Sequence, residues 1–153
     1  MLKLCEHQRA LIDNILSILY ESAVSYPSII LIGPQGSGKR TIASETSKML
    51  GMDYFEIYVG DFYESVYENL FGKYSEAKRA MSEGKPPGAF GVDSPTLIYL
   101  SGFQFLDWKL HQDIHSVISN RIYRDSLGGR RKLNEDLLII AGLTFPDNDI
   151  NIG

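Results

Sequence analysis

One segment, residues 28–39, decides the fold, and it reads SIILIGPQGSGK. Residues 28–32 form an apolar run, which is typical of a central strand buried on both faces of a parallel sheet. A glycine-rich loop follows at 33–38, and residues 39 to about 50 have a helical pattern that Gly51 ends. The sequence therefore predicts a strand, a tight loop and a helix in direct succession.

The loop itself predicts a phosphate-binding site. It matches the GxxxxGK part of the Walker A pattern, and the flanking strand and helix are the context that confirms such a motif. Glycines let successive backbone N–H groups turn toward an anion, and the start of a helix adds a partial positive charge. Lys39 supplies a full positive charge to the β- and γ-phosphates. The predicted nucleotide-binding residues are Gly33, Pro34, Gln35, Gly36, Ser37, Gly38, Lys39, Arg40 and Thr41.

The residue after the lysine differs from the usual pattern. A Ser or Thr normally stands there and its hydroxyl coordinates Mg²⁺, but this chain has Arg40. Thr41 is the next hydroxyl, and one residue along a helix turns a side chain by about 100°. Thr41 is therefore the candidate metal ligand, whereas the prediction of phosphate binding does not depend on a hydroxyl at position 40.

Strand and helix patterns alternate along the rest of the chain. The expected strands are 28–32, 54–59, 95–100 and 137–141, and the expected helices are 3–25, 39–50, 62–83 and 107–124. Such alternation gives an α/β layered fold with a mainly parallel sheet and right-handed crossovers. No internal boundary divides the chain, so residues 1–153 are expected to form a single domain.

Composition limits the possible functions. The net charge is −4 and the sequence pI is about 5.3, so the surface as a whole repels a polyanion. The local basic cluster at 130–132 is of a kind that is most often a solvated face, so direct nucleic-acid binding is not expected.

Cysteine usage and hydropathy bear on the location. Cys5 is the single cysteine, which excludes an internal disulfide and a thiolate metal cluster. No apolar stretch approaches the ~18 to 20 residues that a membrane span requires, and the N-terminus lacks the pattern of a signal peptide. We therefore expect a cytoplasmic protein with no membrane contact.

Beyond the loop, the sequence resembles the AAA+ ATPases, and within them the branch that activates sigma-54 RNA polymerase. The matching stretches keep the order of that branch over roughly residues 10–145. They are 33–39, 68–72 (ENLFG), 88–90 (GAF), 96–100 (TLIYL), the helix 107–120, 128–131 (GGRR) and 138–144 (LIIAGLT). The resemblance implies a three-layer P-loop NTPase fold of the AAA+ type, with ATP or ADP as ligand.

The resemblance also identifies departures at the catalytic positions. In this family the third strand ends in the Asp-Glu pair of Walker B, and here those places align with Ser101 and Gly102. Ser101 and Asp61, which follows the second strand, are the candidate replacements. The residue that senses the γ-phosphate aligns with Thr144. The family's usual binding of Mg²⁺ therefore lacks its usual ligands.

Two further family elements are missing from the sequence. The sigma-54-contacting GAFTGA loop is replaced by a charged, helical-looking stretch at 73–80. The fifth strand, the helical lid and the downstream arginines that complete a neighbour's site have no counterpart in these residues. The chain is expected to be either a piece of a longer protein or a minimal relative.

Four functions follow as hypotheses. The first is an AAA+ domain that binds ATP or ADP, hydrolyses it weakly or not at all, and uses it to favour self-association or partner binding in a regulatory, transcription-regulator-like module. The second is an active AAA+ ATPase that remodels a protein partner. The third is a small nucleotide kinase, because the loop also fits GxxGxGKxT, in which Arg40 is ordinary. The fourth is an interaction module whose loop binds no nucleotide.

Overall fold

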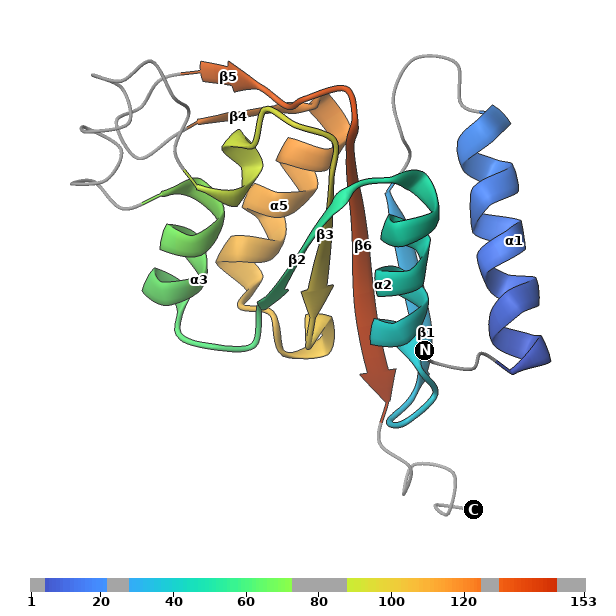
Figure 1. Ribbon diagram of the computed structural model, residues 1–153. Coiled ribbons are helices and arrows are strands. Elements are labelled where there is room, and N and C mark those ends of the chain that lie inside the picture. Colours follow the sequence, from blue (N-terminus) through green and yellow to red (C-terminus); the bar gives the residue numbers. More distant parts are fainter. Residues whose placement is uncertain (1–4, 22–27, 73–87, 125–129, 146–153) are drawn as a thin grey trace, which may run out of the picture.

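A four-stranded parallel sheet forms the centre of the molecule. The computed structural model describes residues 5–21, 28–72, 88–124 and 130–145. The strands lie in the order β1 (Ile29–Pro34), β6 (Leu137–Phe145), β3 (Thr96–Ser101) and β2 (Asp53–Tyr58), and all three pairings are parallel (Figure 1). The predicted α/β fold with a mainly parallel sheet is confirmed.

Helices cover both faces of this sheet. Figure 1 shows α1 (Glu6–Glu21) and α2 (Lys39–Leu50) on one side, and α3 (Tyr63–Phe71) and α5 (Trp108–Asn120) on the other. Side chains of β3 alternate between two cores, because Leu97 and Tyr99 join the cluster beneath α1 and α2 while Ile98 and Leu100 join the cluster beneath α3 and α5. β3 is therefore buried on both faces, which is why its sequence is a continuous apolar run.

The helix predicted at 107–124 is shorter in the structure. It ends at Asn120 because Arg121 adopts a left-handed conformation with φ 55°. The Arg121 guanidinium donates to the carbonyl oxygens of Asn134 and Leu137, at 2.8 and 3.3 Å. These partners are distant in sequence, so helical periodicity could not reveal the end of the helix.

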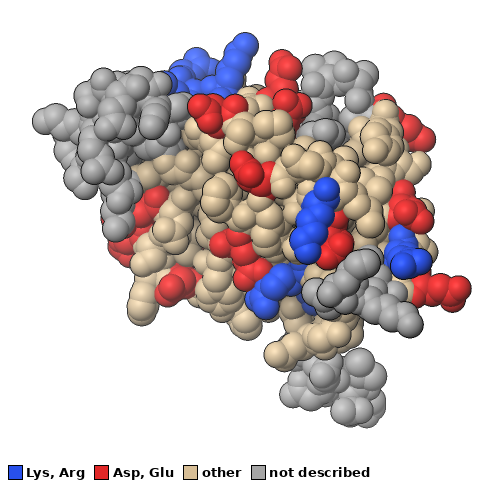
Figure 2. Space-filling view, viewed as in Figure 1, with Lys and Arg blue, Asp and Glu red and all other residues tan. Residues whose placement is uncertain are grey.

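A small antiparallel ribbon follows this helix. Strand β4 (Ile122–Arg124) pairs with β5 (Arg130–Lys132), and the ribbon carries the basic cluster that the sequence shows at 130–132. Lys and Arg side chains gather over this ribbon at the upper edge of Figure 2, whereas acidic and basic side chains are interspersed over much of the remaining face. The sequence predicted no strands here, because each has only three residues.

The ends of α3 and β6 also differ from the predicted boundaries. Helix α3 ends at Phe71, where the prediction continued to 83, and the predicted stretch 73–80 lies outside the described residues. Strand β6 runs to Phe145, four residues beyond the predicted 141, because it pairs with β1 as far as Pro34 opposite Phe145. The first two residues of the loop, Gly33 and Pro34, therefore belong to β1.

The parallel arrangement brings the carboxyl ends of the strands to one edge of the sheet, the lower edge in Figure 1. In open α/β sheets this edge is where ligands bind. The glycine-rich loop leaves β1 at the same edge and leads into α2. None of the helices in the described ranges combines the length and apolar character that crossing a bilayer requires.

Candidate functional site

The loop between β1 and α2 turns sharply on two glycines. Gly36 and Gly38 have φ angles of 82° and 87°, a left-handed conformation that other residues rarely adopt. The Ser37 N–H donates to the Pro34 carbonyl at 3.2 Å, and the Ile42 N–H donates to the Gly38 carbonyl at 2.9 Å. The helix therefore starts directly at the end of the turn, so its unpaired first N–H groups face the loop.

The ammonium group of Lys39 lies within the curve of this loop. Its Nζ donates to the carbonyl oxygens of Gly33 and Pro34, at 3.1 and 3.0 Å, and to Ser37 Oγ at 3.2 Å. Burial lowers the pKa of Lys39 from its ordinary value. Since all three partners are weak neutral acceptors, an incoming phosphate oxygen offers the ammonium a stronger partner than any of them.

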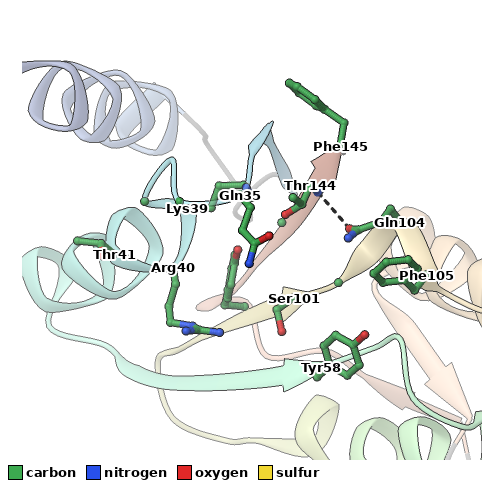
Figure 3. Close-up of a pocket in the computed structure, with 15 residues that line it drawn as sticks. Gln35, Lys39, Arg40, Thr41, Tyr58, Ser101, Gln104, Phe105, Thr144 and Phe145 are labelled. Atoms are coloured by element: carbon green, nitrogen blue, oxygen red, sulfur yellow. Dashed lines mark hydrogen bonds between the residues drawn. The ribbon is translucent and has the colours of Figure 1, made fainter. Parts of the chain in front are cut away.

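A pocket of about 760 Å³ opens beside the loop, within the range of small-molecule sites. The loop and the start of α2 form one wall, and the ends of β2, β3 and β6 with the short helix η2 (Phe103–Phe105) form the other (Figure 3). The lining residues are Gln35, Gly36, Gly38, Lys39, Arg40, Thr41, Tyr58, Tyr99, Ser101, Gly102, Gln104, Phe105, Gly142, Thr144 and Phe145.

Most of the predicted site residues meet at this pocket. Six of the nine predicted nucleotide-binding residues line it, together with Ser101 and Thr144 from the opposite wall. Gly33, Pro34 and Ser37 do not line the pocket, but they supply the three acceptors that position Lys39. The sequence motif and the predicted strand ends thus converge on one site.

Asp61 lies elsewhere. Its carboxylate accepts a hydrogen bond from the Phe62 N–H at 2.9 Å, in the segment that joins β2 to α3, and it does not line the pocket. It is therefore placed to support the turn before α3 rather than to reach the phosphate loop.

Mg²⁺, which the fold family implies, does not fit the donor set. Mg²⁺ in such sites is held by a loop hydroxyl and a carboxylate, yet the described residues lining the pocket include neither Asp nor Glu. Over residues 5–21, 28–72, 88–124 and 130–145, no group of three or more His, Cys, Asp or Glu could hold a metal ion. Thr41 lines the pocket but has no carboxylate partner there.

The Tyr58 side chain crowds position 102. Gly102 has a φ of 71°, and a Cβ placed on it would lie 2.9 Å from Cδ1 of Tyr58 and closer still to the neighbouring ring carbon. The Tyr58 ring, at the end of β2, is half exposed and lies directly against position 102. A side chain at position 102 would therefore require this ring to move.

Within the second wall, Thr144 is bonded to Gln104, a residue that the sequence prediction did not include. The Thr144 N–H donates to Gln104 Oε1 at 3.1 Å, and this bond joins β6 to η2 (Figure 3). Gln104 follows the end of β3 by three residues. Its place just after a predicted strand was the only signal that could have identified it.

Arg40 forms an ion pair across the pocket wall. Its Nε donates to Glu56 Oε1 on β2, and the contact raises the pKa of Arg40. The Arg40 side chain is 70% exposed and that of Glu56 28%. The sequence prediction also missed Glu56, because nothing local relates a strand residue to the phosphate loop.

Comparison with known proteins agrees with this geometry. The family model described as "AAA domain (dynein-related subfamily)" matches residues 28–150. Among solved structures, NtrX from Brucella abortus in complex with ATP is similar, with a TM-score of 0.67, 16% identity, and coverage of 95% of this chain and 30% of that chain. NtrX in complex with ADP gives 0.66, 16%, 99% and 32%.

This chain spans about a third of the length of those solved chains. At 16% identity the likeness establishes the fold. The family match covers most of the chain and includes the loop, Lys39 and the strand ends that form the pocket. The predicted resemblance to AAA+ ATPases is confirmed, and the chain belongs to the AAA domain family, dynein-related subfamily.

Proposed function

We propose that this protein binds ATP or ADP and hydrolyses it weakly or not at all, with the nucleotide acting as a structural or switching ligand. The observation that carries the proposal is the Lys39 ammonium, held inside a glycine turn at the wall of a pocket formed by strand ends. In this role the protein is a regulatory module, similar to a transcription regulator, in the cytoplasm.

Polyphosphate suits the loop wall of the pocket. Backbone N–H groups of the turn, the start of α2 and the ammonium group each attract negative charge. The similar NtrX structures were obtained in complex with ATP and with ADP, which supports the same class of ligand for this chain.

The side chains on the opposite wall of the pocket are the reason to expect weak hydrolysis. Phosphoryl transfer depends on groups that neutralise charge and orient the attacking water. The described lining residues contain no carboxylate, and Gln104 Oε1 already accepts the Thr144 N–H. Loss of one well-placed electrostatic group typically slows catalysis by ~10²–10³.

Nucleotide occupancy would then act through association. We infer that residues 1–153 form one nucleotide-binding domain, and that ligand in the pocket favours self-association or binding of a protein partner. The match to the AAA domain family supports the nucleotide-binding part of this inference.

Titration calorimetry with ATP and ADP, together with phosphate-release assays, tests the function. We expect uptake of both nucleotides and little phosphate release. If neither nucleotide binds, the proposal fails. Steady turnover that Lys39→Ala abolishes would replace it with an active ATPase that remodels a protein partner.

A further inference from the structure

The pocket raises a problem of charge. ATP brings about four negative charges, and P-loop NTPases neutralise part of that charge with Mg²⁺. In the described lining of this pocket, carboxylates that could hold such an ion are missing, whereas two cationic side chains, Lys39 and Arg40, are present. Glu56, the carboxylate bonded to Arg40, is already engaged in an ion pair. The described residues at the pocket therefore offer the outer phosphates cationic side chains rather than a set of metal ligands.

Arg40 stands where the metal-binding hydroxyl usually stands. It directly follows Lys39 in the first turn of α2, and its side chain reaches across to Glu56 on β2. Figure 3 shows this side chain extending from α2 over strand β2, with Ser101 on the neighbouring strand. The Arg40 side chain thus lines the pocket from the first turn of α2, while its guanidinium is bonded to Glu56, two residues before the end of β2.

We propose that the Arg40 guanidinium takes the place of the divalent cation, so that the pocket binds the nucleotide as the metal-free polyphosphate. In the empty protein Glu56 holds the guanidinium at the pocket wall, and a phosphate oxygen displaces Glu56 when nucleotide enters. This inference rests on the proposed function, since it concerns how the same pocket balances the charge of its ligand.

The chemistry of arginine suits this exchange. The bond to Glu56 uses Nε, and the guanidinium carries four more N–H donors on its two terminal nitrogens. A planar guanidinium can bind two phosphate oxygens at once, which gives both charge and direction. Because the Arg40 side chain is largely exposed, its ion pair contributes little net stability and is easily exchanged for a phosphate.

ATP binding to this pocket should not require Mg²⁺. Mg²⁺ bound to ATP occupies the phosphate oxygens that Arg40 would contact, so the metal competes with the side chain. We expect wild-type protein to bind ATP at least as tightly in EDTA as in Mg²⁺, measured by calorimetry on the full chain. Tight ATP binding in Mg²⁺ but not in EDTA would overturn the inference while leaving the proposed function standing.

Substitution of Arg40 is the second test of the inference. Arg40→Ala should weaken ATP binding in EDTA by roughly 10- to 100-fold, the usual range for a hydrogen bond to a charged group. The effect on AMP should be several-fold smaller, because AMP lacks the outer phosphates. Equal losses for ATP and AMP would overturn the inference.

Lys48→Ala is the matched control. Lys48 is an exposed cation on the same helix, paired with Glu45, and it does not line the pocket. Lys48→Ala changes the net charge by the same amount as Arg40→Ala but removes no group from the pocket. ATP affinity should therefore stay within about twofold of wild type. If Arg40→Ala behaves like Lys48→Ala, the side chain has no special role and the inference fails.

Glu56→Gln tests the exchange itself. Freed from its carboxylate, the guanidinium should bind ATP in EDTA as tightly as in wild type or more tightly. A loss as large as that of Arg40→Ala would show that the ion pair is needed intact, which contradicts displacement. Thermal unfolding of each variant checks that the fold is kept, and failure of the wild type to bind ATP or ADP in either buffer would overturn the proposed function as well.

Discussion

The two walls of the pocket differ in what they are made of. The loop wall, residues 33–39, works mainly through backbone groups, with glycines that permit the turn and one lysine that adds charge. The strand wall depends on side chains at the ends of β3 and β6, where Ser101, Gly102 and Thr144 stand. The first wall has the turn and the cation on which the proposed phosphate binding depends, and the described residues of the second wall include neither Asp nor Glu.

This difference separates binding from catalysis. A backbone cradle is lost only if its conformation is lost, since its N–H groups belong to every non-proline residue. A catalytic side chain at a strand end can be replaced with little effect on the sheet, because the ladder of hydrogen bonds runs through the backbone. One pocket can therefore retain a ligand after it has lost the chemistry.

The largest expected effect lies on the loop wall. Lys39→Ala should weaken ATP and ADP binding by at least about 100-fold, because it removes the charged donor held inside the loop that is the proposed phosphate site. Calorimetry measures the loss, and Lys48→Ala on the same helix is the control. Unchanged affinity in Lys39→Ala would show that the loop is not the phosphate site.

Two glycine substitutions compare the walls for stability. Gly36 has left-handed backbone and open space around it, whereas Gly102 has left-handed backbone and the Tyr58 ring in the way. Gly36→Ala should cost about 1 kcal/mol of unfolding free energy from backbone strain alone, and Gly102→Ala about 2–3 kcal/mol. Urea unfolding measures both values, and equal costs would argue against the Tyr58 contact.

The double variant Tyr58→Ala/Gly102→Ala serves as the check on that interpretation. Removing the ring should recover the part of the loss that comes from overlap and leave the part that comes from strain. If the double variant loses as much unfolding free energy as the two single variants together, the cost of Gly102→Ala lies in the backbone only.

A gain-of-function change places one potential metal ligand on each wall of the pocket. Arg40→Ser with Ser101→Asp supplies a hydroxyl on α2 and a carboxylate at the end of β3. ATP affinity in this double variant should become about tenfold higher in Mg²⁺ than in EDTA, which is about 1.4 kcal/mol. A variant without metal preference would show that the walls are too far apart to share an ion.

The smallest expected effect is on pH dependence. Burial lowers the pKa of Lys39. As the pH rises, ATP affinity should therefore begin to fall before the pH reaches about 10.4, the ordinary pKa of a lysine. The stability of the empty protein changes in the opposite direction. A depressed folded-state pKa contributes stability that is present above the unfolded pKa and lost as the pH falls through the folded pKa. Calorimetry measures the trend in ATP affinity, and thermal unfolding measures the trend in stability. If ATP affinity does not change as the pH rises to about 10.4, the expected loss of affinity is contradicted.

Sequence reasoning found the elements and most of the pocket. The run at 28–32, the glycine loop and Lys39 are contiguous, so their arrangement follows from local conformational preferences. Ser101 and Thr144 were candidates because they align with functional positions of the AAA+ family, and the structure places both at the pocket. Asp61 was a candidate as the carboxylate that follows the second strand, but it lies three residues beyond the end of β2 and does not line the pocket.

The missed features depend on contacts between distant segments. The end of α5 depends on Arg121 reaching the chain near 134 and 137, and the length of β6 depends on its pairing with β1. Gln104 and Glu56 acquire a role only through partners 40 and 16 residues away. No periodicity or motif encodes such pairs.

The amino-acid sequence by itself determined the cradle, since glycine φ angles, a lysine and the start of a helix are local properties of residues 33–39. Only the tertiary structure decided what faces that cradle. Strand order brings Tyr58 against Gly102 and Arg40 against Glu56, because neighbouring strands in a sheet need not be neighbours in the chain.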